Sequence, residues 1–263
     1  MFNKLPDPDL ATLARPPAQL VVFGLSWEEE RPLRPSDGIS WQRLLAASGF
    51  EGAPLQKVQQ QTVNISGIQG RAFSMSPSEI REGWQVARSD QSGHAALYAD
   101  SCTLERITYP GFDAFADEIR AVAGAAQELL NPSIRTRISL RYANALSTPE
   151  ATSPSYWREK VSPSFLSLGS DDRLVDDFSR LLSIADFKEG DTGVQVRFAF
   201  QPDAVFPNAV VYIFDIEATN GALTSFTIES CVEAARALNK LARKLFNAIL
   251  TPTYIETLKT PNA

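Results

Sequence analysis

Hydrophobic positions recur every three or four residues in two long segments of the chain, as they do on one face of an α-helix. In "DAFADEIRAVAGAAQELL" they include Phe115 and Ile119, and in "TIESCVEAARALNKLARKLFNAIL" they include Leu241 and Leu245. A proline follows soon after each segment, and proline does not continue a helix. The pattern therefore predicts two long helices, each with one apolar face against a core.

Segments in which hydrophobic and polar positions alternate precede both helices, and this pattern is typical of antiparallel hairpins. The first predicted hairpin turns at Asp90 to Gly93 and the second around Pro202 to Asn208. Further strands are expected at "PPAQLVVFGLSW" and "NPSIRTRISLRYANAL", each followed by a short helix that carries Trp41 or Trp157. The same order of elements thus occurs twice, although a chance recurrence of such common elements is the alternative.

This repeated order predicts an α+β fold made of a duplicated unit: strand, short helix, antiparallel strands and long helix. Two such units would form a curved antiparallel sheet with both long helices packed on one face, which resembles the saddle of TATA-box-binding proteins. We expect an extension at residues 1–16, a first half at 17–131, a second half at 132–258 and a tail at 259–263.

The strand predicted within "SIRTRISLRYANAL" carries three arginines on a chain whose net charge is −6. Because successive side chains of a strand alternate sides, Ile138 and Leu140 are expected on the core face. The same alternation predicts Arg135, Arg137 and Arg141 on the opposite face.

The segment "YIFDIEA" predicts a strand that could supply partners for these arginines. Asp215 and Glu217 share one face of it, and cross-strand pairs with Arg137 and Arg141 would contribute a few tenths to about 1 kcal/mol each. A solvated, charge-paired surface is the simpler interpretation. The functional one is a binding face for a protein or a small anionic ligand, on which Asn144 and Asp215 fix the orientation of the partner.

The composition of the chain limits which kinds of partner it could bind and where in the cell it could lie. The net charge of −6 argues against binding along a phosphate backbone, which needs clustered Lys and Arg. The chain begins without the pattern of a signal peptide, and its apolar runs are short for a membrane span. With Cys102 and Cys231 as its only cysteines, a disulfide framework is not expected. These features predict a cytoplasmic protein without membrane contact, and they leave its oligomeric state open.

The residues offer little to the common catalytic chemistries. His94 is the only histidine, so a catalytic triad or a structural zinc site would have to be built around it, and an ordinary half-exposed histidine is the simpler interpretation. No phosphate-binding glycine motif is present. Asp172 and Asp176 stand one helical turn apart and could bind Mg²⁺, but a solvated acidic surface is the commoner meaning of such a cluster. We therefore predict no catalytic residue, no metal and no cofactor.

Two motifs carry a resemblance to a known family. The chain resembles a sporadically distributed bacterial family of about this length, described as of unknown function, in an "RIGLRYIN"-like strand and a C-terminal "lDiD…L…LR…iF…iT" run. It departs from the family at Ser139, Ala143 and Glu217. The matching positions are Arg137, Leu140, Arg141, Tyr142, Asn144, Phe214, Asp215, Ile216, Leu238, Phe246 and Thr251. The patchy distribution of the family resembles that of defence and toxin–antitoxin genes.

Three functions remain open at this point. The leading hypothesis is a non-catalytic, intracellular binding or regulatory protein, encoded in a defence or toxin–antitoxin locus, that uses the arginine-bearing face. The second is an enzyme that uses Asp215 and Glu217 as carboxylates and Arg141 as an electrostatic stabiliser. The third is a nucleic-acid-binding saddle, which would need Lys and Arg to dominate its concave side.

Overall fold

A computed structural model describes residues 2–5, 7, 13–50, 54–66, 74–166, 171 and 181–260. This part of the chain forms an α+β fold, with an open antiparallel sheet of ten strands and four α-helices. None of the helices described is long and apolar enough to cross a bilayer.

The first half of the chain supplies five strands and two helices. It begins with a strand that becomes the centre of the sheet, and it ends with a long helix. The elements are β1 (Ala18–Trp27), α1 (Pro35–Leu45), β2 (Leu55–Ser66), β3 (Ser74–Ala87), β4 (Gly93–Leu97), β5 (Ser101–Arg106) and α2 (Phe112–Leu130).

The second half also begins with a central strand, and it ends with a long helix and a shorter C-terminal one. Its elements are β6 (Ile134–Leu146), β7 (Leu181–Glu189), β8 (Thr192–Pro202), β9 (Val210–Asn220), β10 (Thr224–Ser225), α3 (Ile228–Ile249) and α4 (Pro252–Lys259). Both expected hairpins, β3–β4 and β8–β9, are present.

The strands lie in the order β2-β3-β4-β5-β1-β6-β9-β8-β7, with the short β10 paired to β6. Neighbours are antiparallel throughout, and Phe23 of β1 faces Leu140 of β6 at the middle of the sheet. The two strands that open the two halves are therefore adjacent, although more than a hundred residues of chain separate them.

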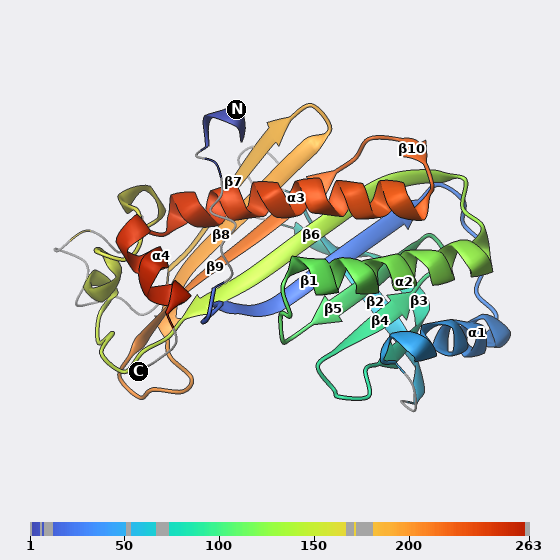
Figure 1. Cartoon of the computed structure of the whole chain (residues 1–263), viewed down its shortest axis with the longest axis horizontal. Helices are drawn as coiled ribbons and strands as arrows, with labels where there is room; N and C mark the ends of the chain where they lie inside the picture. Colours follow the sequence, from blue (N-terminus) through green and yellow to red (C-terminus); the bar gives the residue numbers. More distant parts are fainter. Residues whose placement is uncertain are drawn as a thin grey trace.

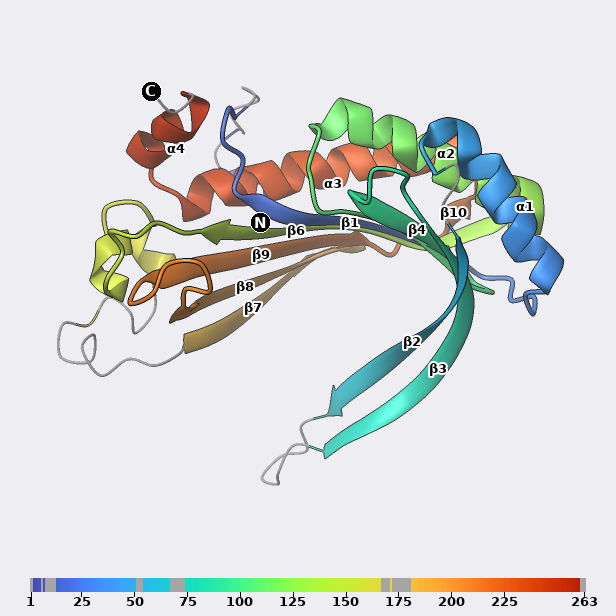
Figure 2. The ribbon, with the colours of Figure 1, turned by 90° about the horizontal axis from the view of Figure 1, so that it is seen from below.

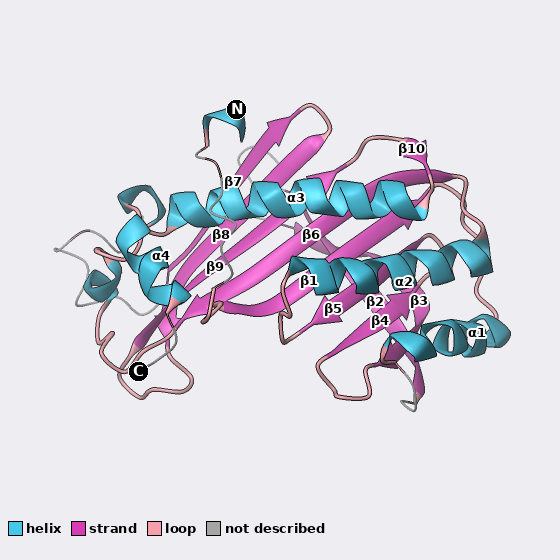
Figure 3. Cartoon of the chain, viewed as in Figure 1, coloured by secondary structure: helices cyan, strands magenta, loops and turns pink. Residues whose placement is uncertain are grey.

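Both long helices cover one face of the sheet, side by side (Figures 1 and 3). Seen from the side, α1, α2 and α3 lie above the sheet, and the β2–β3 hairpin bends away on the opposite side (Figure 2). The sheet therefore has one covered face and one open face, and the hairpin stands beside the open one.

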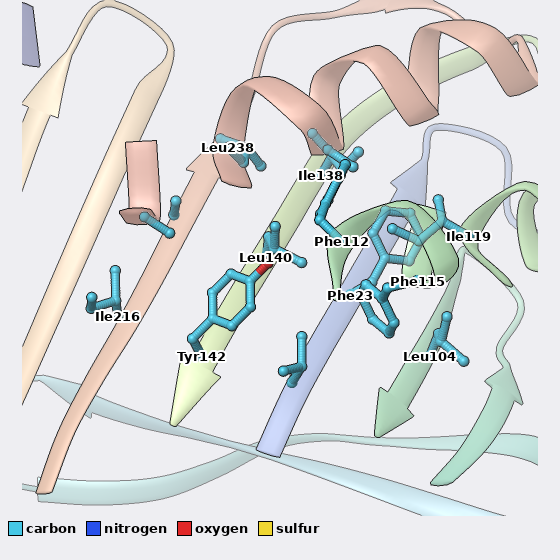
Figure 4. Packing of buried hydrophobic residues seen from close by; sticks show 14 of the residues in the cluster. Phe23, Leu104, Phe112, Phe115, Ile119, Ile138, Leu140, Tyr142, Ile216 and Leu238 are labelled. Carbon is cyan, nitrogen blue, oxygen red and sulfur yellow. The ribbon is translucent and has the colours of Figure 1, made fainter. Parts of the chain in front are cut away.

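The core fills the space between the helices and the covered face. Figure 4 shows Phe115 and Ile119 of α2 packed over Phe23 and Leu104, with Leu238 of α3 over the neighbouring strands. The predicted apolar stripe of α3 is buried, and so is that of α2. Leu241 and Leu245 are buried as predicted, and Val122 of α2 and Ile249 of α3 are buried with them.

The ends of the helices follow local chemistry. The hydroxyl of Thr227 accepts a hydrogen bond from the backbone N–H of Ser230 and so caps the first turn of α3. Asn131 ends α2 in the left-handed region at φ 48°, a conformation that asparagine tolerates better than most residues.

The short helix expected around Trp157 is only a 3-10 turn, Pro154–Trp157. Its indole is buried, and the indole N–H donates to the backbone carbonyl of Val210 at 2.9 Å. A contact with a distant strand, rather than helix formation, therefore holds this tryptophan in place.

Candidate functional site

The open face carries a ladder of charged side chains from three adjacent strands. Its members alternate in sign across the strands because β6 and β8 contribute arginines and the strand between them, β9, contributes carboxylates. Each member forms an ion pair with the next in the order Arg137, Glu217, Arg197, Asp215 and Arg141. We call these five residues the arginine ladder.

Asp215 receives hydrogen bonds from both sides. Arg141 of β6 donates from Nε to Oδ1 at 2.9 Å and from Nη2 to Oδ2 at 2.6 Å, which is a two-pronged guanidinium–carboxylate pair. Arg197, directly opposite Asp215 in the β8–β9 register, donates from Nη1 to Oδ2 at 3.0 Å. These bonds to Asp215 raise the pKa of Arg141 further above its already high ordinary value.

Glu217 also receives hydrogen bonds from two arginines, and its side chain is less buried than that of Asp215. Arg137 donates from Nη2 to its Oε1 at 3.1 Å, and Arg197 donates from Nη2 to its Oε2 at 3.3 Å. Arg197 is thus shared by the two carboxylates and joins the two halves of the ladder.

The two signs of charge lie at different depths. The side chains of Arg137 and Arg141 are 55% and 40% exposed, whereas those of Asp215 and Glu217 are 8% and 23% exposed. An approaching partner therefore meets guanidinium groups first, with the carboxylates beneath them.

Arg135 does not belong to this face, contrary to the sequence prediction. It is buried on the covered face, where its Nη1 donates to the backbone carbonyl of Ser230 in α3 at 3.0 Å. The register explains the error: Ser26 pairs with Arg137 but Trp27 pairs with Arg135, so Thr136 is an extra residue in β6. Such a bulge reverses the alternation of sides beyond it.

Asn144 also lies on the covered face, so the expectation that it orients a partner beside Asp215 is wrong. It is buried, and its Nδ2 donates to the carbonyls of Tyr142 and Phe214 at 3.1 and 3.2 Å. The physical reason is simple alternation, because Asn144 is two residues from Tyr142 and shares its side of the strand.

Exposed apolar side chains border the arginine ladder. Leu182 and Ile184 of β7 are 56% and 57% exposed, and Ile184 is the register partner of Arg197. Across from them, the β2–β3 hairpin projects on the same side of the sheet (Figure 2). The open face is thus a bordered surface that combines apolar and charged groups.

The other candidates for chemistry stay apart from the ladder. His94 lies 3.6 Å from Glu105 in the neighbouring strand, and both are partly exposed. Among the described residues, no three His, Cys, Asp or Glu side chains come together as metal ligands would. Asp172 and Asp176 lie outside the described residues.

Sequence reasoning missed Arg197 as a member of the site. The alternation of apolar and polar residues in "VQVRFAF" could have identified it, because this pattern places Arg197 on the side of β8 that faces away from the core. It also missed a polar group on the covered face formed by Tyr109, Tyr142 and Asn239, since nothing in the spacing of these residues marks a contact.

Comparison with known proteins assigns no family. No family model and no curated protein matches the chain. Among solved structures, the S. pombe Pct1 RNA triphosphatase in complex with the Spt5 CTD aligns over 93% of this chain and 87% of that one, at 8% identity and a TM-score of 0.13. The structure of the S. pombe Pct1 RNA triphosphatase aligns over 94% and 87%, at 8% identity and a TM-score of 0.12. Scores this low establish no shared fold.

Proposed function

We propose that the protein is a non-catalytic binding protein and that its open face binds a protein partner. The observation that carries this proposal is the combination of exposed Leu182 and Ile184 with the outward-facing guanidinium groups of the arginine ladder. Exposed apolar side chains beside arginines are characteristic of protein interfaces.

The layered charges define the partner further. Because the arginines cover the carboxylates, the surface favours a polypeptide segment that carries both acidic and apolar side chains. Leu182 and Ile184 would receive its apolar residues, and Arg137 and Arg141 its carboxylates. The projecting β2–β3 hairpin gives this segment a wall on one side.

The alternative functions fit this geometry less well. The oxygens of Asp215 are occupied by Arg141 and Arg197, so they are poorly placed to take a proton from a substrate. Binding of nucleic acid would need a continuous basic surface, whereas carboxylates separate the arginines of the ladder.

We also infer that the two halves of the chain are repeats of one unit and together form a saddle. Each half opens with a central strand, β1 or β6, and later contributes a strand that pairs with it, β5 or β9. A long helix follows, directly after β5 in the first half and after the short β10 in the second. This order supports the inference, and the open face would then be the concave underside of the saddle.

The test compares matched surface substitutions in a capture experiment with tagged full-length protein. Ile184→Asp and Arg137→Ala should each abolish or strongly weaken recovery of the partner that wild type retains. Leu223→Asp is the control for the first, because Leu223 is also strongly exposed but lies off the sheet face, between β9 and β10.

Arg120→Ala is the control for the second substitution. Arg120 lies on α2, and its side chain is 51% exposed and paired with Asp117, much as Arg137 is exposed and paired with Glu217. Equal recovery by all four variants would contradict the proposal, and so would equal loss.

A further inference from the structure

A cavity lies on the covered face, away from the arginine ladder. It has a volume of about 550 Å³ and is found where the start of α2, the second half of α3 and α4 meet above the sheet. This volume is in the range of sites that hold small organic molecules. More of its wall is apolar than polar, and the apolar side chains include Leu13, Phe112, Ile216, Phe246 and Ile255. The cavity therefore suits a molecule with a mostly apolar body.

The charged groups around the cavity already have partners. Arg236 pairs with Asp113 at 3.1 Å, and both residues line the cavity. Lys259 pairs with Glu256 of the same helix at 2.6 Å, and Arg243 has a partner as well. A charged ligand would have to compete with these partners while it gives up its own hydration. The pairing therefore favours a ligand without net charge.

A relay of hydrogen bonds on the wall of the cavity runs in one direction. The hydroxyl of Tyr142 donates to Oδ1 of Asn239 at 2.8 Å, which uses its one hydrogen. The hydroxyl of Tyr109, 3.3 Å away, therefore donates to the oxygen of Tyr142, and the oxygen of Tyr109 is left to accept. Burial raises the pKa of both tyrosines, so both hydroxyls keep their protons at neutral pH.

Asn144 provides a second acceptor on the same wall. Both hydrogens of its amide are used, by the backbone carbonyls of Tyr142 and Phe214 at 3.1 and 3.2 Å. Its Oδ1 is thus the end of the side chain that remains for a ligand, and this side chain lines the cavity although the residue is more than nine-tenths buried. With the oxygen of Tyr109, the wall therefore offers two acceptors to a ligand that carries a donor.

We propose that this cavity binds a neutral, largely aromatic molecule that carries a hydrogen-bond donor, as a phenol does. Its O–H or N–H donates to Tyr109 or Asn144, and its rings lie against the apolar wall. Several of the described lining residues are themselves aromatic, among them Tyr109, Phe112, Tyr142 and Phe246. Aromatic side chains pack favourably against a further ring, edge to face or offset.

The test measures the binding of matched probes to the full chain by isothermal titration calorimetry. 2-Naphthol carries the donor, 2-methoxynaphthalene has the same rings without it, and 2-naphthoate carries a negative charge in its place. We expect 2-naphthol to bind about fivefold more tightly than 2-methoxynaphthalene, the factor that a net hydrogen bond of about 1 kcal/mol gives. 2-Naphthoate should bind more weakly than 2-naphthol, because the cations around the cavity are paired.

Two pairs of variants locate the effect. Tyr109→Phe removes one of the two acceptors and should reduce the preference for 2-naphthol, whereas Tyr98→Phe removes a hydroxyl from a buried tyrosine outside the lining and should not. Ala114→Trp should obstruct the cavity and weaken the binding of every probe, because Ala114 is an exposed residue of the lining. Glu128→Trp places the same side chain at an exposed position of α2 outside the lining and should change nothing. Thermal unfolding of each variant confirms that the fold is intact.

The wild-type protein alone can overturn the proposal. Equal affinity for 2-naphthol and 2-methoxynaphthalene would mean that the acceptors do not contact the ligand, and tighter binding of 2-naphthoate would mean that the site selects an anion. An absence of binding by 2-naphthol would contradict the proposal outright. Binding that survives Ala114→Trp in a folded protein would place the probes elsewhere on the molecule.

Discussion

Arg197 is the residue on which the charge pairing of the open face depends. It bonds to both Asp215 and Glu217, whereas Arg137 and Arg141 each bond to one of them. The consequences of removing each arginine should therefore differ, although all three are of the same type and lie on the same face.

We predict a graded loss of stability in alanine variants of these arginines. Arg137→Ala removes an exposed pair and should cost about 0–1 kcal/mol. Arg197→Ala should cost about 2–3 kcal/mol, because it leaves each carboxylate with one partner and Asp215 is nearly buried. Arg141→Ala should fall between them.

Urea unfolding of the three variants provides the measurement. A loss for Arg137→Ala as large as that for Arg197→Ala would show that the ladder is not coupled through Arg197. Because Arg137→Ala is expected to leave the fold intact, it is also the arginine substitution suited to the capture experiment.

The sequence predicts part of the candidate site at this scale. Alternation correctly places Arg137, Arg141, Asp215 and Glu217 on one face, because it holds along a regular strand. It fails for Arg135, since a bulge depends on how β6 pairs with β1 and leaves no mark in the local sequence. Alternation also gives no indication of residues that meet only through tertiary contacts, such as Tyr142 and Asn239.

At the scale of elements, the apolar stripe of α3 is what fixes this helix to the sheet. Leu245 is buried within that stripe, and Lys240 is exposed on the other side of the helix. Leu245→Ala should cost roughly 2–5 kcal/mol through lost burial and the cavity it leaves. Lys240→Ala should stay within about 0.5 kcal/mol, as surface substitutions do.

Thermal or urea unfolding compares the two variants directly. Similar small losses in both would mean that the end of α3 is not anchored to the core.

Long helices and hairpins were predictable because their signals are local and repeat over many residues. Both long helices and both predicted hairpins are present. The structure around Trp157 was not predictable in this way, because its four-residue 3-10 turn is too short to show a helical period. Its position is set by Val210, which lies more than fifty residues further along the chain.

The whole molecule is organised around the β1–β6 pair, where the two halves meet. If the halves are repeats, then a fragment of residues 13–131 should pair its own β1 with the β1 of a second copy. The antiparallel arrangement of β1 and β6 makes this exchange geometrically possible, since a two-fold axis relates two identical antiparallel strands.

We therefore expect this fragment to form a homodimer, which light scattering after size-exclusion chromatography would detect. The fragment of residues 132–260 should dimerise in the same way through β6, and mixing the two fragments should favour the heterodimer that restores the native pair. Fragments that are folded yet stay monomeric would argue against the inferred repeat.

The two buried thiols allow the opening of each half of the fold to be measured separately. Cys102 lies on β5 in the first half of the chain, and Cys231 lies at the start of α3 in the second. Burial raises the pKa of both thiols, and alkylating reagents react with the exposed thiolate. The rate at which each cysteine is labelled in the native protein should therefore report how often its own half opens. Equal rates would indicate that the ten-stranded sheet unfolds as one cooperative unit, and unequal rates that one half opens before the other.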